Sequence, residues 1–188
     1  TADRIEAEVF HTDYQQIGHF ESTSPLLNNI RDITLWSIRG NSMSIPTDCP
    51  QRDERMGWMG DAHLAGEPTM LTFDTAAYYE NWLRVIADSQ DEAGHVPDTA
   101  PPAEYGEAEG SPPWAVAYPL VTWYLYRYYG DVRAVAEHYD NLVRWFGTLE
   151  GHAKDHIVEY CRYGDWVGLE DTPGPLISSG VYYWTAKI

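Results

Sequence analysis

Cysteine and basic residues are scarce in this chain of 188 residues. The two cysteines, Cys49 and Cys161, are too few for a disulfide framework, and we expect both to be free thiols. Lysine and arginine number 12 against 29 acidic residues, so the formal net charge is 12 − 29 = −17. Because this charge repels phosphate groups, we expect neither nucleic acid nor an anionic membrane surface as a partner. A neutral ligand fits the composition better.

Long apolar runs and targeting signals are absent as well. No stretch reaches the roughly 18 apolar residues that cross a membrane. The first residues lack both an initiator methionine and the basic-then-apolar pattern of a signal peptide. The chain stops within the apolar segment Tyr182–Ile188 without a capping glycine. We therefore expect a piece of a longer protein, whose cellular location the sequence leaves open.

Pairs of metal-ligating residues are also missing. His63 lies near Asp61 and Glu67 in the sequence, but no second histidine or cysteine follows at the spacing of a zinc site. We predict no metal and no other cofactor.

Aromatic residues, in contrast, are abundant. The chain contains 8 tryptophans and 14 tyrosines, and its 44% of hydrophobic residues suffice for one domain with a sizeable core. Such an excess suits a carbohydrate-binding cleft, in which flat rings cover a sugar. Large aromatic side chains serve helix packing equally well, so both interpretations stay open.

Hydrophobic residues at spacings of three and four predict a mainly α-helical chain. One short strand is expected over Ile5–His11, where apolar and polar residues alternate. The candidate N-caps of the first three helices are, in chain order, Ser22 or Ser24, Asp61, and Thr72 or Asp74. The expected helices cover about residues 25–42, 62–66, 72–87, 113–130 and 131–151, and a further one begins near residue 176.

Two of these helices, joined by Gly130-Asp131, form an αα-hairpin, the repeating unit of an (α/α) barrel. The first is apolar on all sides, which predicts complete burial. In the second we expect the inward face to consist of Val132, Val135, Tyr139, Leu142, Val143 and Phe146. In the helix of residues 72–87 a core stripe is expected at Ala77, Tyr78, Trp82, Val85 and Ile86.

A long acidic loop separates two of the helices. Residues 90–113 have no hydrophobic period and are rich in proline, glycine, aspartate and glutamate. More than about 20 residues are too many for a mere connection in a compact domain. This acidic loop is either part of a cleft wall or a disordered excursion.

The segment Thr47–Asp61, called the charged segment below, carries the chemistry. It combines four carboxylates and two arginines with Trp58, a mixture typical of functional loops. Neighbouring charges act on the Glu54 carboxyl group in opposite directions, because Asp53 favours its protonated form whereas Arg52 and Arg55 favour its ionised form. A carboxyl group that keeps its proton near neutrality is a general acid for a leaving oxygen. The alternative is a solvated cluster of surface ion pairs.

The charged segment resembles the signature of the bacterial α-L-rhamnosidases. The similarity extends without a gap over Thr47-Asp48-Cys49-Pro50-Gln51-Arg52-Asp53-Glu54-Arg55 and includes Gly57-Trp58 and Gly60-Asp61. Members of this family are inverting glycoside hydrolases with an (α/α)6-barrel catalytic domain. The resemblance implies that Glu54 is the general acid and that Asp48 and Asp61 contact the rhamnose. Met59 stands where the family often has threonine.

Other segments extend this resemblance to further substrate-binding residues. By position, Arg52 and Trp58 belong to the sugar site, and Gly94–Asp98 resembles a strand-like segment that borders the cleft. Trp114 matches a sugar-stacking tryptophan, although Ala115 and Val116 replace the polar residues that often follow it. Gly164-Asp165-Trp166 is similar to a cleft-lining segment, which implies that Trp166 packs on the substrate and Asp165 binds it.

The resemblance therefore implies a partial (α/α)6 barrel with a short N-terminal strand. Residues 1–22 would be the last strand and linker of a preceding β-domain, and residues 23–188 the first part of the catalytic domain. The expected reaction is hydrolysis of terminal α-L-rhamnose residues, with the catalytic base in a segment beyond this chain. If the chain alone is active, it must contain the base, and the candidates are Glu104, Glu107, Glu109 and Glu170.

Two other function classes remain open at the level of sequence. One is a carbohydrate-binding or assembly module of the same fold without turnover, and the other is a different (α/α)-barrel enzyme such as a lyase or a debranching hydrolase. A partial barrel exposes apolar helix faces that normally pack against further helices, so we also expect self-association.

Overall fold

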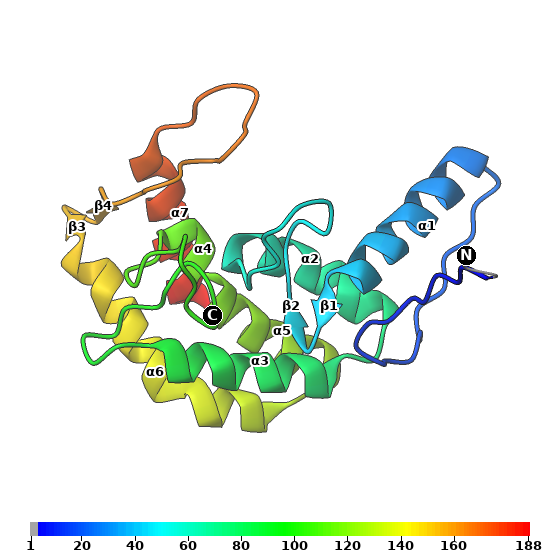
Figure 1. Ribbon diagram of the computed structural model, residues 1–188. Coiled ribbons are helices and arrows are strands. Elements are labelled where there is room, and N and C mark those ends of the chain that lie inside the picture. Colours follow the sequence, from blue (N-terminus) through cyan, green and yellow to red (C-terminus); the bar gives the residue numbers. More distant parts are fainter. Residues whose placement is uncertain (1–3) are drawn as a thin grey trace.

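The computed structural model describes residues 4–188 and is mainly helical, as the sequence predicts (Figure 1). Two small hairpins are the strands found in the described residues: β1 pairs antiparallel with β2, with Ser42 opposite Pro46, and β3 pairs with β4, with Ala153 opposite Val158. The elements in chain order are α1 (Pro25–Gly40), β1 (Ser42–Met43), β2 (Ile45–Pro46), α2 (Met59–Thr72), α3 (Ala76–Ser89), α4 (Pro112–Ala115), α5 (Ala117–Tyr129), α6 (Val132–Gly151), β3 (Ala153–Lys154), β4 (Ile157–Val158) and α7 (Gly174–Lys187).

The core is built around α5. This helix contacts α2, α3 and α6, and in Figure 1 it lies between α2 above and α3 with α6 below. From Ala117 to Leu125 its side chains are buried or half-buried on all sides, as the apolar pattern predicts, and Tyr118, Leu120 and Leu125 have no exposed surface. Tyr126 and Arg127 in its last turn are exposed, so the burial is not complete. Trp82 and Ile86 of α3 are equally buried, which confirms the expected core stripe, although Ala77 at its edge is exposed.

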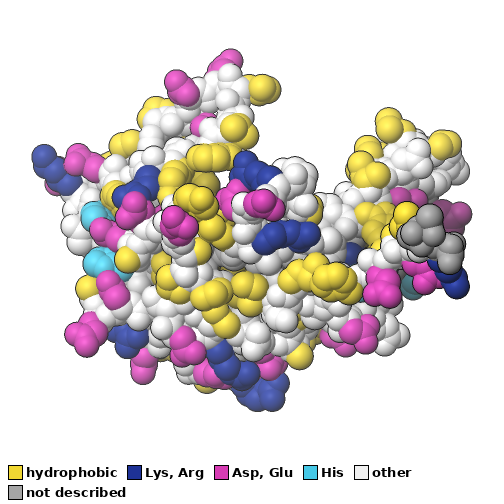
Figure 2. Space-filling model, in the orientation of Figure 1, with side chains coloured by type: hydrophobic (Ala, Val, Ile, Leu, Met, Phe, Trp, Pro, Cys, Tyr) yellow, Lys and Arg dark blue, Asp and Glu magenta, His cyan; other side chains and the backbone are white. Residues whose placement is uncertain are grey.

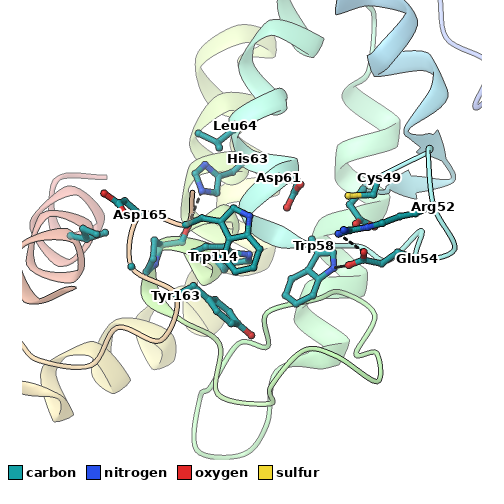
Figure 3. A pocket seen from close by; sticks show the side chains of 16 residues that line it. Cys49, Arg52, Glu54, Trp58, Asp61, His63, Leu64, Trp114, Tyr163 and Asp165 are labelled. Atoms are coloured by element: carbon teal, nitrogen blue, oxygen red, sulfur yellow. Dashed lines mark hydrogen bonds and ion pairs between the residues drawn. The ribbon is translucent and has the colours of Figure 1, made fainter. Parts of the chain in front are cut away.

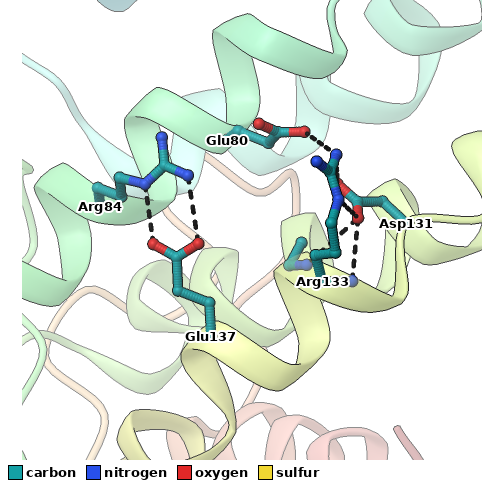
Figure 4. A network of polar contacts seen from close by, with 6 residues as sticks. Glu80, Arg84, Asp131, Arg133 and Glu137 are labelled. Atoms are coloured by element: carbon teal, nitrogen blue, oxygen red, sulfur yellow. Dashed lines mark hydrogen bonds and ion pairs between the residues drawn. The ribbon is translucent and has the colours of Figure 1, made fainter.

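The turn between α5 and α6 forms as expected. Gly130 ends α5 in the left-handed region with φ 67°, and Asp131 caps α6 by accepting hydrogen bonds from the backbone N–H groups of Arg133 and Ala134. Figure 4 shows how polar contacts on the surface then join α6 to α3. Arg84 donates to Glu137 at 2.8 Å and 3.2 Å. These exposed pairs fix the side-chain geometry but add little to stability.

The buried face of α6 differs from the expected one. Three of the predicted inward residues, Val132, Tyr139 and Val143, are 63%, 59% and 52% exposed. The buried residues are instead Ala134, His138, Trp145 and Leu149. The prediction was wrong because α6 is apolar on two faces, and the packing partners decide which face is buried. His138 is drawn inward by Tyr118, whose hydroxyl lies 2.8 Å from His138 Nδ1.

The predicted N-terminal strand is not found. The described part of the segment has extended backbone without strand pairing, and Ile5, Val9 and Phe10 are 92%, 68% and 76% exposed. Alternating residues form a strand only when another strand provides hydrogen bonds, and the described residues offer none beside it. The Thr12 N–H donates to the Ser42 carbonyl at 2.7 Å, and Gln16 then forms an isolated bridge with Phe73. Residues 1–3 of the expected β-domain linker lie outside the described residues.

The starts of α2 and α3 also differ from those expected from the sequence. α2 begins at Met59 and continues to Thr72, so Asp61 lies in its first turn and is not its cap. α3 follows Thr75 at the cap position, and neither Thr72 nor Asp74 caps it. Ser24 occupies the cap position of α1 without a side-chain hydrogen bond to the helix. The shift at α2 matters for function, because it frees the Asp61 carboxylate for other contacts.

The acidic loop is ordered and joins the charged segment. Residues 96–100 are buried, and Trp58 forms an isolated bridge with Thr99. On either side of this bridge the Met59 N–H donates to the Asp98 carbonyl and the Ala100 N–H to the Gly57 carbonyl, both at 2.9 Å. The acidic loop is therefore ordered and supports the charged segment. It is not a disordered excursion.

Apolar side chains remain exposed on α1. Figure 2 shows hydrophobic side chains gathered on the part of the molecule that α1 forms at the upper right. The exposed residues there are Leu26, Leu27, Ile30, Ile33 and Trp36. No helix in the described residues is both long enough and apolar enough to cross a membrane.

Candidate active site

The charged segment is held in shape by its own backbone. Asp48 and Met56 face each other: the Asp48 N–H donates to the Met56 carbonyl at 3.0 Å, and the Met56 N–H donates to Asp48 Oδ1 at 2.8 Å. Arg55 Nη1 donates to the Gly40 carbonyl at the end of α1 at 2.6 Å. The segment therefore closes into a loop whose ends meet, and Asp48 is only 3% exposed.

Both oxygens of the Glu54 carboxyl group have partners. Trp58 Nε1 donates to Oε1 at 2.7 Å, and Arg52 Nη2 lies 2.5 Å from Oε2. Figure 3 shows this arrangement at one side of a cavity. The side chain of Glu54 is 14% exposed, so it is oriented by its neighbours and still reached from the cavity.

This main cavity has a volume of about 400 Å³, within the usual range for small-ligand sites. Its walls come from segments far apart in the sequence: the charged segment, the start of α2, the beginning of α4 and the loop before α7. All eight residues that the sequence assigns to the site line it: Asp48, Arg52, Glu54, Trp58, Asp61, Trp114, Asp165 and Trp166. The structure brings them together, and their individual roles are taken up under the proposed function.

Three rings form an aromatic wall opposite the polar wall of Asp48, Arg52 and Glu54. Trp114 lies 4.7 Å from Tyr163 and 6.2 Å from Trp166 between ring centroids, and Tyr163 lies 5.9 Å from Trp166. Gly60 allows Trp114 to approach α2, because a Cβ atom at this position would lie 2.7 Å from Trp114 Nε1. Trp166 is 65% exposed, so the aromatic wall offers an open ring at the mouth of the cavity.

Asp61 projects into the cavity between the two walls (Figure 3). Burial of its carboxyl group raises its pKa, and the nearby charges of Asp48 and Glu54 act in the same direction. Part of the side chain remains exposed, so the group is accessible to a ligand. A carboxylate with a raised pKa and few protein partners is a strong acceptor for sugar hydroxyl groups.

Asp98 and Tyr163 belong to the site although the sequence analysis did not select them for it. Asp98 has no exposed surface and accepts hydrogen bonds from the Ser111 N–H at 2.7 Å, the Glu107 N–H at 3.1 Å and the Tyr163 hydroxyl at 2.9 Å. Burial raises the pKa of Asp98 and, together with the Asp98 hydrogen bond, raises the pKa of Tyr163 to about 12. Asp98 thus fixes the acidic loop and the central ring of the aromatic wall together. A signal existed for Tyr163, which lies two residues before Asp165.

His63 and Cys49 also line the main cavity without having been assigned to it. His63 Nε2 lies 2.9 Å from the Pro113 carbonyl, and burial lowers the pKa of its imidazole. The ring therefore stays neutral at pH 7 and donates to that carbonyl, which ties α2 to the residue before Trp114.

One group of metal-ligating atoms within 4.8 Å of one another occurs in the described residues, at Asp48, Cys49 and Glu54. Burial raises the pKa of the Cys49 thiol, and its contact with Asp48 adds to the shift. The ligand form of cysteine is the thiolate, so a metal would have to displace this proton and separate Arg52 from Glu54. Both cysteines are free thiols in the described residues, as expected.

The four remaining glutamates considered as a base do not line the main cavity. Glu107 pairs with Arg162 at 2.5 Å, and Glu109 pairs with His152 at 2.5 Å. Glu104 and Glu170 are exposed. In the described residues, Glu54 is therefore the glutamate that lines this cavity.

Comparison with known proteins gives a consistent result. The sequence model of the bacterial α-L-rhamnosidase six-hairpin glycosidase domain matches residues 15–188. An α-L-rhamnosidase of Formosa agariphila is 30% identical over 98% of this chain, and one of Streptomyces avermitilis is 32% identical over 98%. The chain covers 21% and 18% of these two relatives, so it spans about a fifth of their length.

Solved structures show the same fold. The α-L-rhamnosidase from Dictyoglumus thermophilum is 41% identical and superposes with a TM-score of 0.88 over 93% of this chain and 20% of its own. The Streptomyces avermitilis α-L-rhamnosidase complexed with L-rhamnose is 32% identical, with a TM-score of 0.88 over 94% of this chain and 17% of its own. The expected fold class, a part of the helical barrel, is confirmed. The chain belongs to the bacterial α-L-rhamnosidase family, as a part of its six-hairpin glycosidase domain.

Proposed function

We propose that this chain provides the acid side of a catalytic domain that removes terminal α-L-rhamnose residues from rhamnosides with inversion of configuration. The observation that carries the proposal is the position of Glu54, an oriented carboxyl group that faces an aromatic wall across one cavity. Residues 23–188 form the first part of this domain, and residues 1–22 lead into it from a preceding domain.

Each residue of the cavity has a role in this proposal. Glu54 donates its proton to the glycosidic oxygen as the bond breaks, and Trp58 and Arg52 orient its carboxyl group. Asp48 and Asp61 accept hydrogen bonds from rhamnose hydroxyl groups. Trp114 and Trp166 cover the apolar face of the ring, and Asp165 binds a hydroxyl group near the mouth of the cavity.

An inverting glycosidase also needs a second carboxylate about 6.5–9.5 Å from the acid, which activates water on the opposite face of the sugar. We assign this base to a segment beyond the chain, because Glu54 is the glutamate of the described residues at the main cavity and the aspartates there are assigned to sugar hydroxyl groups. This chain alone then binds the sugar but does not turn it over.

Binding without turnover is also the second candidate function, a carbohydrate-binding or assembly module. The observation that favours it is the pairing of Glu107 with Arg162 and of Glu109 with His152, which holds these two candidate bases away from the main cavity. A protein of this kind would use the aromatic wall and the aspartates, and Glu54 would not be needed.

A fluorescence titration with L-rhamnose tests the proposal, because the cavity contains three tryptophans. We expect saturable quenching by L-rhamnose, no response to D-glucose, and affinity at least tenfold weaker for Asp61→Asn. Asp74→Asn, at an exposed aspartate just after the end of α2 that does not line the main cavity, serves as the matched control. An equal response to both sugars would refute the assignment of the cavity. Hydrolysis of an aryl α-L-rhamnoside by the chain alone would refute a base beyond it.

A further inference from the structure

A second cavity lies next to the charged segment. This rear cavity has a volume of about 110 Å³ and is enclosed by the end of α1, the first residues of the charged segment, α2 and α3. It shares Asp48, Cys49 and Asp61 with the main cavity but includes no residue of the aromatic wall. No lysine, arginine or histidine lines it.

Unpartnered polar atoms are concentrated in this rear cavity. Four buried side-chain atoms in the described residues have no hydrogen-bond partner: Arg31 Nε, Asn41 Oδ1, Thr47 Oγ1 and Tyr78 Oη. The last three belong to residues that line the rear cavity. Tyr78 is 8% exposed, so bulk water does not satisfy its hydroxyl group. Buried polar groups without partners are rare and costly, and three around one cavity indicate a common partner.

Two other hydroxyl groups around the rear cavity, those of Ser42 and Thr69, already have partners. Ser42 donates to the Ile38 carbonyl and accepts from Tyr14, both at 2.7 Å. Thr69 donates to the Ala65 carbonyl at 2.6 Å. The protein therefore satisfies these groups and leaves the three unpartnered atoms to whatever occupies the cavity.

We propose that the rear cavity holds a cluster of ordered water molecules that hydrogen-bonds to Asn41, Thr47 and Tyr78 and positions Asp48 from behind. A cavity holds one water molecule when it offers about 10–15 Å³ and two to four polar partners. The rear cavity offers several times this volume and the three unpartnered atoms. Water is thus the occupant that fits both its size and its lining.

The donors and acceptors favour water over a metal cation. A hard cation binds oxygen lone pairs, but it would leave the hydroxyl protons of Thr47 and Tyr78 without an acceptor. Water accepts these two protons and donates to Asn41 Oδ1. The same molecule satisfies both kinds of group, whereas a cation satisfies one.

This water cluster has a consequence for the proposed sugar site, and this step rests on the proposed function. Asp48 Oδ1 is fixed by the Met56 N–H, and the Asp48 side chain lines both the rear cavity and the main cavity. Water bound in the rear cavity fixes the second oxygen, so that the carboxylate presents a constant orientation to a rhamnose hydroxyl group. Asn41, Thr47 and Tyr78 are then positioning residues, which act on the sugar through Asp48.

A high-resolution crystal structure of the chain tests the occupant directly. We expect water molecules about 2.7–3.2 Å from Asn41 Oδ1, Thr47 Oγ1 and Tyr78 Oη. A dry or collapsed cavity would overturn the proposal. A cation with contacts of about 2.3–2.6 Å would also overturn it, in favour of a metal site.

Thermal unfolding gives a second, independent test that needs no crystal. Thr47→Val and Tyr78→Phe remove one unpartnered oxygen each with little change of shape. In a dry cavity these changes relieve a buried polar group and raise the Tm, whereas in a hydrated cavity they break a hydrogen bond to water and lower it. We expect a lower Tm for both variants. Tyr183→Phe, at a tyrosine that is 67% exposed on α7, is the matched control and should leave the Tm unchanged.

The positioning role is separated from a purely structural role by Thr47→Ser. This variant keeps the hydroxyl group and loses a methyl group, so it should lower the Tm and retain the affinity for L-rhamnose. Thr47→Val should weaken that affinity severalfold. Loss of affinity in proportion to the fall in Tm for both variants would refute the positioning role. If the unaltered chain does not bind L-rhamnose, the proposed function fails, while the crystal structure and the Tm still decide whether water occupies the rear cavity.

Discussion

The polar wall and the aromatic wall of the main cavity are held by different kinds of contact. The polar wall depends on neighbours in the sequence, since Asp48 bonds to Met56 and Glu54 bonds to Arg52 and Trp58. The aromatic wall depends on distant ones, because Tyr163 is fixed by Asp98, 65 residues earlier. Changes to the polar wall should therefore alter chemistry and leave stability nearly intact, whereas changes to the aromatic wall should alter stability and binding together.

The largest effect is expected for Glu54→Gln in the polar wall. The test uses a chimera in which this chain replaces the matching segment of the Dictyoglumus thermophilum relative. Loss of the general acid should lower kcat for an unactivated rhamnoside by about 10²–10⁴-fold, with a smaller loss for a substrate whose leaving group needs no proton. Asp53→Asn, at the exposed neighbouring carboxylate, is the control. Equal losses for both substrates would contradict the role of Glu54 as an acid.

The next largest effect concerns the aromatic wall. Gly60→Ala should place a Cβ atom against Trp114 and cost about 1–3 kcal/mol of stability through overpacking. Displacement of the ring should also weaken L-rhamnose binding, which calorimetry and the fluorescence titration measure on the same sample. Gly147→Ala in α6, where a Cβ atom meets nothing within 4 Å, is the matched control. Unchanged binding after a clear loss of stability would remove Trp114 from the sugar site.

The pH dependence of unfolding probes Asp98, which supports the aromatic wall. Because burial raises the pKa of Asp98 in the folded state, the folded chain binds its proton more tightly than the unfolded chain. The contribution of this group to stability is then complete below the unfolded pKa of about 3.9 and is lost as pH rises through the folded pKa. Asp98→Asn should flatten this fall in urea unfolding measured from pH 4 upward. An unchanged slope would show that Asp98 does not titrate in this window.

The smallest effect on either wall is expected for a change on α1. Ile33 is 67% exposed on the apolar face of α1, and we expect this face to promote self-association. Ile33→Glu should reduce the rise of the apparent molar mass with protein concentration in light scattering and leave the affinity for L-rhamnose unchanged. Asp32→Glu is the control for charge at the neighbouring exposed position. A monomeric unaltered chain at high concentration would contradict the expected association.

The contrast between the walls also explains what the sequence could predict. The residues of the polar wall lie within one segment, and the resemblance of this segment to the rhamnosidase signature was what assigned Asp48, Arg52 and Glu54 to one site. Asp98 was missed as the support of the aromatic wall, because this role depends on hydrogen bonds from Ser111 and Tyr163, which are distant in the sequence. The position of Asp61 was predicted wrongly as a helix cap, since α2 begins at Met59, three residues before the expected start at residue 62.

Tertiary contacts explain the other differences. The predicted inward face of α6 was wrong because the apolar residues of this helix cover two faces. Only the contacts with Tyr118 and the neighbouring core determine that His138 and Trp145 are buried. The prediction of a strand at Ile5–His11 was wrong. Alternating apolar and polar residues favour a strand, but they do not provide the second strand with which it must pair. The burial of α5 was predicted correctly from Ala117 to Leu125, since a helix that is apolar all round has no polar face to turn outward. Its last turn, with Tyr126 and Arg127, is exposed and differs from the prediction.

The hydrogen bond between Asp98 and Tyr163 has a consequence for the order of folding. The α5–α6 hairpin depends on contacts between residues close in the sequence, and such contacts form fast. The aromatic wall has to wait until residue 163 has closed a loop of 65 residues back to Asp98. During synthesis, helix content should therefore appear before sugar binding, and a chain stopped just before Tyr163 should be helical and unable to hold rhamnose.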